Sequence, residues 1–319
     1  MGLLLFTLCA FVLLTLVSGG YIFFLACRKR NMDWMDEKAV ASTPYAQFYP
    51  FIVATDHWLK ARQPQPVCTV AEDGVNLHGL WIPANNSCGT ILMAHGYRST
   101  MLLDFHLPFQ LFHRLGFDIL VPQQRTHGKS GGKYITFGIK ESSDMQCWIR
   151  FHNENLSQKP MILYGISMGA STMLYLADRI LPANVRGIVA DCPFTSPRDI
   201  ITHVYRSVLH VPPVLSVWAA GVFARIFAGV SLRDCDTRIS LAHSRLPVLL
   251  IHGSADTFVP SRMSQEAYNA CSAKKDLLIV ENADHGLSYL IDGVSYAAHV
   301  IDFLKENIPD FSIPKSIED

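Results

Sequence analysis

Residues 161 to 171 read Met161-Ile-Leu-Tyr-Gly165-Ile-Ser167-Met168-Gly169-Ala-Ser171, and this stretch decides the fold. A short apolar run leads into Gly-x-Ser-x-Gly, and a stretch of helical composition follows. In a strand–turn–helix setting the turn is so tight that glycine is needed on both sides of the serine, whose hydroxyl is then exposed at the start of the helix. The helix dipole favours negative charge at that point. The pattern therefore predicts Ser167 as a nucleophile; the alternative is a Gly-Ser turn without chemistry.

Outward from this stretch, short apolar runs alternate with helical stretches. The runs have the length of buried strands: Thr90–Ala94, Phe117–Val121, Met161–Tyr164, Gly187–Ala190, Val248–Ile251 and Leu277–Val280. The stretches between most of them have the length of helices: Met101–Leu115, Glu141–Asn153, Met168–Leu181, Ser261–Ala270 and Leu287–Asn307. Ahead of them, Val67–Val70 and Val75–Ile82 flank the turn signal Glu72-Asp73-Gly74, which predicts an antiparallel hairpin. We expect an α/β fold with a mostly parallel, eight-stranded sheet and helices on both faces.

One insertion interrupts the alternation. More than fifty residues without a clear strand separate Asp191 from Val248. Structureless loops of that length are rare, so we expect a helical cap at 194–245 over the C-terminal edge of the sheet. Val211–Val230 within it is nearly all apolar, with Arg225 its one charge, and could be a second membrane span. Pro212-Pro213, Gly221 and Arg225 favour the cap.

A serine nucleophile needs a base, and the base needs an orienting acid. Of thirteen histidines, His285 directly follows the last predicted strand and precedes the closing helix, so its loop faces the serine turn. Asp256 follows the strand at Val248–Ile251 and fits the chain order serine, acid, histidine. Asp191 is the rival acid. Glu281 and Asp284 are expected to be solvated loop charges.

Acyl transfer also needs donors for the developing oxyanion. The strand ending at Ala94 runs into His95-Gly96-Tyr97, so the backbone N–H of Tyr97 is predicted to pair with that of Met168. Independently of any catalytic role, His95-Gly96 is expected to form a turn that ends the strand. The eight cysteines have irregular spacing without a Cys-x-x-Cys pair, so neither a metal site nor a redox motif is indicated, and scattered reduced thiols are expected.

The N-terminal segment has the length of a membrane anchor. Leu3 to Cys27 carries no charge and would span about 37 Å as a helix, against about 30 Å of hydrocarbon. A cleaved signal peptide is the alternative, but a basic start is missing. Arg28, Lys29 and Arg30 then place the large domain in the cytoplasm. We expect an anchor at 1–30, a helical linker at 31–66 and one domain at 67–319.

The overall composition gives no indication of a nucleic-acid partner. The chain has 319 residues, with 17% charged residues and a formal net charge of zero. Roughly 290 residues remain outside the anchor, enough for one large domain with a buried core. A balanced charge gives no electrostatic reason to expect nucleic acid as a partner.

From Val67 to Ile308 the chain resembles the α/β-hydrolase superfamily, in its prolyl-oligopeptidase-like and serine-aminopeptidase-like branch. The resemblance is carried by His95-Gly96-Tyr97, Gln124–Gly132, the turn around Ser167, His252–Asp256 and Asp284-His285-Gly286. The whole chain looks like membrane-anchored members with one N-terminal span. The resemblance implies triad chemistry, an oxyanion hole and no cofactor. Gln123 replaces the aspartate that is customary before Arg125, so a role for that side chain is not expected.

The expected reaction is hydrolysis through an acyl-enzyme. A small-molecule acyl ester is the first substrate class, as in carboxylesterases and lipases, because the apolar cap and the anchor suit a hydrophobic acyl group near a membrane. A peptide or amide substrate, cleaved by an aminopeptidase or amidase on the same triad, is the alternative. An inactive binding protein on the same fold is the third possibility, since fold does not fix function.

Overall fold

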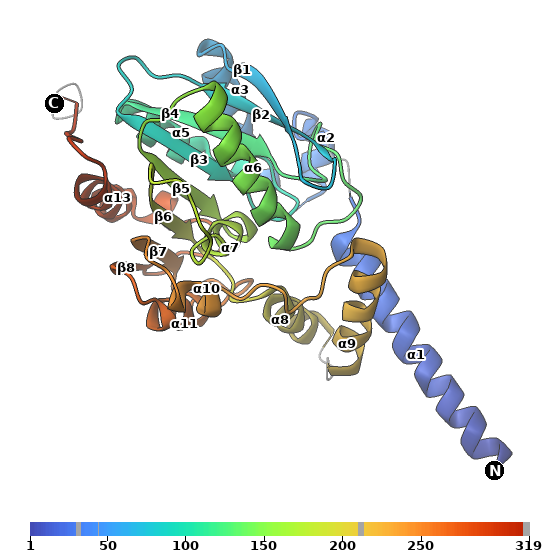
Figure 1. Ribbon diagram of the computed structural model, residues 1–319. Coiled ribbons are helices and arrows are strands. Elements are labelled where there is room, and N and C mark those ends of the chain that lie inside the picture. The colour runs from blue at the N-terminus through green and yellow to red at the C-terminus, as the bar shows by residue number, and fades with distance from the viewer. Residues whose placement is uncertain (30–32, 44, 210–213, 315–319) are drawn as a thin grey trace.

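The computed structural model describes residues 1–29, 33–43, 45–209 and 214–314 (Figure 1). In this described part, eight strands form one sheet in the order β1-β2-β4-β3-β5-β6-β7-β8. The strands are β1 (Gln65–Val70), β2 (Asn76–Ile82), β3 (Gly89–Ala94), β4 (Phe117–Gln123), β5 (Met161–Ile166), β6 (Val185–Asp191), β7 (Val248–Gly253) and β8 (Lys275–Val280). Strand β2 pairs antiparallel with β1 and β4, and the other neighbours pair in parallel. The predicted mostly parallel sheet with an antiparallel entry hairpin is confirmed.

Helices cover both faces of the sheet. They are α2 (Glu37–Ala41), η1 (Ala46–Phe48), α3 (Tyr49–Ala61), α4 (Met101–Asp104), α5 (His106–Arg114), α6 (Ile139–Asn155), α7 (Met168–Leu174), α11 (Arg262–Ala270), α12 (Ser288–Ile291) and α13 (Gly293–Asn307). The helix predicted at Met168–Leu181 ends early, because hydrogen bonds from Leu176 and Ala177 reach back only three residues. The helix predicted at Leu287–Asn307 is divided at Asp292, whose side chain caps α13 by accepting from the Ser295 N–H.

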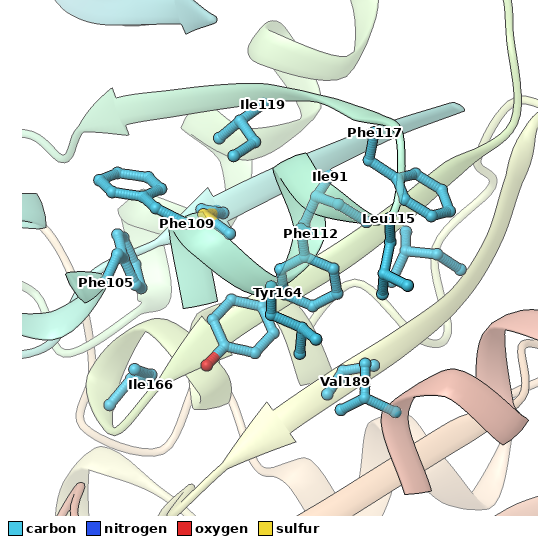
Figure 2. Close-up of a cluster of buried hydrophobic side chains, with 14 of the residues drawn as sticks. Ile91, Phe105, Phe109, Phe112, Leu115, Phe117, Ile119, Tyr164, Ile166 and Val189 are labelled. Atoms are coloured by element: carbon cyan, nitrogen blue, oxygen red, sulfur yellow. The ribbon is translucent and has the colours of Figure 1, made fainter. Parts of the chain in front are cut away.

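The core has two layers because side chains alternate along each strand. Ile91 and Met93 of β3 face α3, α5 and α13, whereas Leu92 and Ala94 face α6, α7 and α11. Figure 2 shows the first layer, in which the ring of Phe112 from α5 lies 5.2 Å from that of Tyr164 in β5. Burying a large apolar side chain stabilises a fold by about 1.5–3 kcal/mol. The core therefore holds the C-terminal ends of the strands in fixed positions.

The segment predicted as a linker at 31–66 packs onto the domain. Ile52 and Leu59 of α3 are buried, and Trp58 stacks on Phe109 of α5 with ring centroids 5.5 Å apart. Residues 31, 32 and 44 of this segment lie outside the described residues. In the remainder, α3 contributes to the same core layer as α5 and α13.

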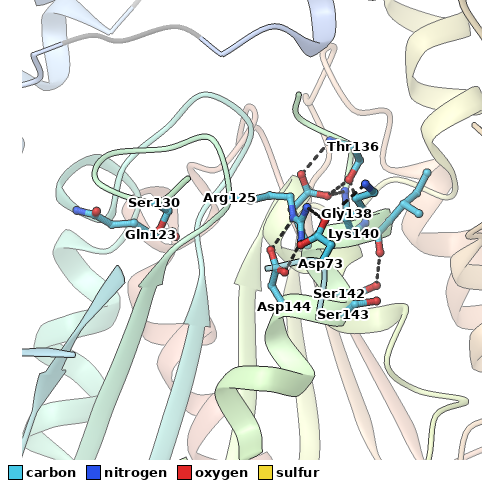
Figure 3. A network of polar contacts seen from close by, with 12 residues as sticks. Asp73, Gln123, Arg125, Ser130, Thr136, Gly138, Lys140, Ser142, Ser143 and Asp144 are labelled. Carbon is cyan, nitrogen blue, oxygen red and sulfur yellow. Dashed lines mark hydrogen bonds and ion pairs between the residues drawn. The ribbon is translucent and has the colours of Figure 1, made fainter. Parts of the chain in front are cut away.

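A buried ion-pair network fixes the turn after β4 (Figure 3). The Arg125 guanidinium donates to both carboxylate oxygens of Asp144 in α6, at 2.7 and 2.5 Å, and to Asp73 in the β1–β2 turn at 3.0 Å. Two-pronged pairing of this kind fixes geometry as well as charge. The entry hairpin, the β4 turn and α6 are thereby held together.

Gln123 corrects the expectation that position 123 has no role. Its side-chain oxygen accepts a hydrogen bond from the Lys129 N–H at 2.8 Å, which closes the turn that follows β4. Its backbone carbonyl accepts from the Ser130 hydroxyl, also within this turn. The Gln123 side chain therefore has a structural role in this turn.

The insertion between β6 and β7 is helical. It contains α8 (Pro197–Leu209), α9 (Val214–Phe223), the single π-helical turn η2 (Ala224–Ala228) and α10 (Thr237–Ala242). Pro212-Pro213, which favoured a cap over a membrane span, lies outside the described residues, as does Arg30 of the basic cluster. A third apolar cluster lies beneath these helices and includes Met168, beside the serine turn.

The N-terminal helix α1 (Gly2–Cys27) projects from the domain, and α9 lies along the half nearest the domain (Figure 1). Among the described residues it is the one helix long and apolar enough to cross a membrane, by length and composition. Most of its side chains are exposed, but Ile22, Phe23 and Cys27 are buried in the third apolar cluster. The end of α1 is therefore part of the folded domain.

Candidate active site

The turn between β5 and α7 holds Ser167 in a strained backbone conformation. Its φ is 55° and its ψ is −118°, a region that residues with side chains rarely adopt. A Cβ at Gly165 would lie 2.4 Å from the Gly169 carbonyl, and a Cβ at Gly169 would lie 1.8 Å from the Ala94 carbonyl oxygen. Both glycines are therefore required by contact distance, as the sequence pattern predicted.

Two further loops bring a base and an acid to this serine. His285, in the loop between β8 and α12, has its Nε2 atom 2.9 Å from the Ser167 hydroxyl oxygen. Its Nδ1 atom lies 2.6 Å from a carboxylate oxygen of Asp256, which follows β7. The loops after β7 and β8 lie so close that a Cβ at Gly253 would be 2.1 Å from the Ala283 carbonyl oxygen. The structure thus brings together all three residues predicted from the sequence.

The surroundings of Asp256 keep its carboxylate ionised. Burial alone would raise its pKa, but hydrogen bonds from His252 and His285, and the charge of His285, outweigh burial and lower the pKa to about 2. The backbone N–H groups of Phe258 and Val259 also donate to this carboxylate, at 3.0 and 2.8 Å. An ionised acceptor fixes the His285 proton on Nδ1, which leaves Nε2 free to accept the serine proton.

The other acidic candidates occupy different positions. Asp191 accepts the Ser167 N–H with its backbone carbonyl at 2.8 Å, and its side chain is buried behind the serine turn. Glu281 accepts from the Ser254 hydroxyl, and Asp284 accepts from the His285 N–H; both are exposed. The imidazole Nδ1 is therefore paired with Asp256.

Asp191 should reduce stability at neutral pH. Burial raises its pKa from 3.8 to about 6, so the folded protein holds this proton more tightly than the unfolded chain. Its contribution to stability is then lost as the pH rises from about 4 to 6. We expect Asp191→Asn to raise the free energy of unfolding by about 2–3 kcal/mol at pH 7 and to have little effect at pH 4. Thermal unfolding at the two pH values measures this, and an equal effect at both would contradict it.

The predicted oxyanion loop follows β3. Gly96 lies against the serine, since a Cβ there would be 3.5 Å from the Ser167 Cβ, and Tyr97 and Ser167 line the same pockets. Met168 is the first residue of α7, where the helix presents its N–H groups. His95 has a structural role: its Nε2 accepts from the Gln124 N–H at 3.1 Å, and burial lowers its pKa to about 3.

Asp104 is a component of the site that the sequence did not indicate. Its buried carboxylate accepts the Gly96 N–H at 2.6 Å and the Ser99 hydroxyl at 2.5 Å, so it holds the loop that carries Tyr97. Burial raises its pKa to about 6. An aspartate in the first turn of a short helix looks like an ordinary surface residue in sequence, so no signal distinguished it.

The chain is similar to a known protein family and to several solved structures. The model of the serine aminopeptidase S33 family matches residues 85–240, which include the serine turn. The Pyrococcus furiosus esterase Pf2001 superposes with a TM-score of 0.63 and 25% identity, covering 78% of this chain and 95% of that one. Mouse α/β-hydrolase domain-containing protein 10 shares the fold at a TM-score of 0.56 and 18% identity, covering 76% and 99% of the two chains.

The chain has the α/β-hydrolase fold. The Bacillus subtilis protein YqkD is similar over 240 residues at 28% identity, which covers 74% of this chain and 77% of YqkD. The fold, the family model and the esterase structure agree that this chain is a hydrolase with esterase-like relatives.

Two pockets of this α/β-hydrolase meet at Ser167. One has a volume of about 130 Å³ and is lined by His285, Asp104 and, from the segment before β1, Tyr45 and Phe48. The other has a volume of about 360 Å³ and an almost wholly apolar lining. Its wall comprises Tyr21, Ile22, Leu25, Ala26, Tyr97, Phe137, Phe194, Ile200, Ile201, Val204, Tyr205, Phe258 and Val259. We call the first the small pocket and the second the apolar pocket.

Three side chains at the site belong to types that can bind a metal ion. Ligand atoms of Cys192, Asp256 and His285 all lie within 4.8 Å of one another, the one such group among the described residues. Thiols bind metals as thiolates, but burial raises the pKa of Cys192 well above its ordinary value. The carboxylate and the imidazole already pair with each other. This donor set fits a metal poorly.

The contact at Gly169 gives a testable consequence for folding. We expect Gly169→Ala to destabilise this α/β-hydrolase by about 1–3 kcal/mol or more, because the added methyl group collides with the β3 backbone. Gly221→Ala, in α9, is the matched control, since its Cβ would meet only Leu232 at 3.8 Å. Chemical denaturation of both variants measures the difference. A Gly169→Ala protein as stable as Gly221→Ala would show that the turn is looser than described.

Proposed function

We propose that this α/β-hydrolase is a serine hydrolase that cleaves a carboxylic ester through an acyl-enzyme, as carboxylesterases and lipases do. The observation that carries the proposal is the continuous hydrogen-bonded chain from the Ser167 hydroxyl through His285 to the ionised Asp256. A serine hydroxyl is a weak nucleophile until an adjacent base accepts its proton, and this chain supplies that base in the correct tautomer.

The proposed reaction has two halves. The Ser167 oxygen attacks the carbonyl carbon while His285 Nε2 takes the hydroxyl proton, and the N–H groups of Tyr97 and Met168 stabilise the oxyanion. The C–O bond to the alcohol then breaks, and His285 returns the proton to the leaving oxygen. A water molecule then attacks the acyl carbonyl while His285 takes one of its protons. The bond between the acyl group and Ser167 breaks, His285 returns the proton to the Ser167 oxygen, and the acid is released.

The two pockets fit the two halves of an ester. His285 must reach the leaving oxygen, and it lines the small pocket, so we assign the alcohol to the small pocket. The acyl group then occupies the apolar pocket, whose volume of about 360 Å³ lies within the range of ligand sites, about 300–1,000 Å³. This assignment favours an apolar acyl group and a small alcohol.

The aminopeptidase alternative is supported by the family model and opposed by the pocket. An aminopeptidase substrate carries its charged amine on the acyl side, and a desolvated ammonium needs a carboxylate partner. None of the described residues that line the apolar pocket is acidic. We therefore propose ester hydrolysis ahead of peptide or amide hydrolysis.

A substrate panel tests the proposal. p-Nitrophenyl esters of increasing acyl length and aminoacyl p-nitroanilides would be offered to the full chain in detergent, with Ser167→Ala as the blank. We expect ester turnover that disappears in Ser167→Ala and little anilide turnover. Faster anilide turnover would favour the aminopeptidase, and absence of turnover with both classes would favour an inactive binding protein.

We also propose that the protein is a single-pass cell-membrane protein with its catalytic domain in the cytoplasm. The support is the uncharged helix α1, followed at once by Arg28 and Lys29, since basic residues tend to remain on the cytoplasmic side. Protease added outside intact cells should therefore leave the domain whole. Digestion of the domain in intact cells would place it on the opposite side.

A further inference from the structure

We propose that helix α1 is a wall of the acyl site as well as an anchor, so that the enzyme draws a long-chain acyl ester directly from the lipid bilayer. This inference rests on the proposed ester hydrolysis at Ser167. The ligand class is an ester that is embedded in a membrane by its acyl chain.

The apolar pocket lies between α1 and α8. Tyr21, Ile22, Leu25 and Ala26 of α1 line one side, and residues of α8 such as Ile201 line another. Ser167 lies at the same pocket. An acyl chain bound to the serine would therefore lie against the membrane helix.

This wall is fixed to the domain by backbone contacts. The Ile135 N–H donates to the Cys27 carbonyl at 2.7 Å, and the Lys29 N–H donates to the Lys133 carbonyl at 3.2 Å. Helix α9 approaches α1 so closely that a Cβ at Gly19 would lie 2.3 Å from the Ala219 Cβ. Small residues at such a crossing are typical of helices that pack within a membrane.

The same helix end contacts the proposed oxyanion loop. The Tyr97 hydroxyl donates to the Ala26 carbonyl at 2.7 Å, and the Arg98 guanidinium donates to the Leu25 carbonyl at 2.5 Å. The last carbonyls of a helix have no partner within the helix, so these side chains satisfy them. The position of α1 is thus linked to the position of the proposed oxyanion loop.

The pocket opens on the apolar side of the molecule. Tyr21 and Leu25 line it yet are 65% and 44% exposed. Alongside, α9 and η2 expose Trp218, Ile226 and Phe227. Exposed apolar side chains of this kind, next to an uncharged helix of 26 residues, fit a lipid bilayer better than water.

The depth of the opening matches the membrane interface. Helix α1 is about 39 Å long at 1.5 Å per residue, whereas the hydrocarbon core is about 30 Å thick. Tyr21 lies within about 9 Å of the domain end of the helix. The opening would therefore lie near the boundary between headgroups and acyl chains, where lipid ester groups are found.

Three tryptophan substitutions in the full chain test this inference in detergent micelles. Ala26→Trp fills the pocket from α1, Ile201→Trp fills it from α8, and Leu13→Trp places the same side chain on an exposed part of α1 outside the pocket. The measured quantity is the ratio of kcat/KM for p-nitrophenyl laurate to that for p-nitrophenyl acetate. Each methylene denied an apolar site costs about fourfold, so we expect the first two variants to lower the ratio about tenfold or more. Leu13→Trp should match the wild type.

The outcomes separate this inference from the proposed function. If Ala26→Trp keeps the wild-type ratio while Ile201→Trp lowers it, esters are cleaved but α1 is not a wall, and the inference fails. If the wild type cleaves no ester, the proposed function itself fails. Leu25→Ala adds no bulk, so it tests the inference even if the tryptophan variants misfold. It should raise kcat/KM for p-nitrophenyl palmitate relative to that for p-nitrophenyl laurate. An unchanged ratio would count against the inference.

Discussion

Replacing Ser167 by alanine is expected to lower kcat for ester hydrolysis by about a million-fold, as loss of the nucleophile does in other serine hydrolases. In the proposed mechanism the acyl-enzyme forms through the Ser167 oxygen, so its removal leaves no covalent route. The fold should be unchanged, because the Ser167 N–H still donates to the Asp191 carbonyl and the flanking glycines remain. Initial rates with a p-nitrophenyl ester, together with the unfolding temperature, measure both effects.

Ser254→Ala is the matched control for this substitution. Ser254 lies after β7 at the same rim of the sheet and is exposed; its hydroxyl donates to the Glu281 carboxylate and accepts from the Asn282 N–H. Its removal should leave ester turnover near the wild-type rate. Turnover that survives in Ser167→Ala within about tenfold of the wild type would mean that another group is the nucleophile, because loss of the nucleophile lowers kcat by about a million-fold.

Replacing Asp256 by asparagine is expected to lower kcat by about 10⁴-fold, because an amide favours the wrong tautomer of His285. The ionised carboxylate accepts from Nδ1–H and so presents Nε2 to the serine. An amide that donates to Nδ1 moves the proton to Nε2, which then cannot accept from Ser167. Steady-state kinetics with the same ester measures the loss.

Asp191→Asn is the matched control for this substitution. It makes the same chemical change at the rival acid, and we expect it to keep most of the activity while gaining stability at neutral pH, because burial raises the pKa of Asp191. If Asp191→Asn loses more activity than Asp256→Asn, the assignment of the acid is wrong. The pair therefore decides between the two aspartates that the sequence left open.

The sheet could be predicted from sequence because each strand is a short apolar run bounded by turn residues. The chain order serine, acid, histidine then located Ser167, Asp256 and His285, since parallel strands end at one edge of the sheet. The structure brings these side chains within hydrogen-bonding distance. Glycine at 165 and 169 was predictable for a local reason, the contact that any Cβ would make there.

Long-range packing was not predictable from composition. An apolar helix buried in protein and one exposed to lipid have the same amino acids, so the sequence of α1 did not reveal its contacts with α9 and with Tyr97. Asp104 gave no signal because its carboxylate accepts from the Gly96 N–H and the Ser99 hydroxyl, and these contacts depend on how the loop after β3 folds back on α4. Gln123 was misjudged because its side-chain oxygen accepts from the Lys129 N–H, a contact that depends on the path of the turn after β4.

The central claim is that Ser167 is the activated nucleophile, and covalent labelling tests it most directly. The full chain in detergent would be treated with an alkyl fluorophosphonate, digested, and the modified residue located by mass spectrometry. We predict a single adduct on Ser167 in the wild type and strongly slowed labelling in His285→Ala, because the base is then missing. An adduct on any other residue, or labelling of Ser167 at an unchanged rate in His285→Ala, would contradict it.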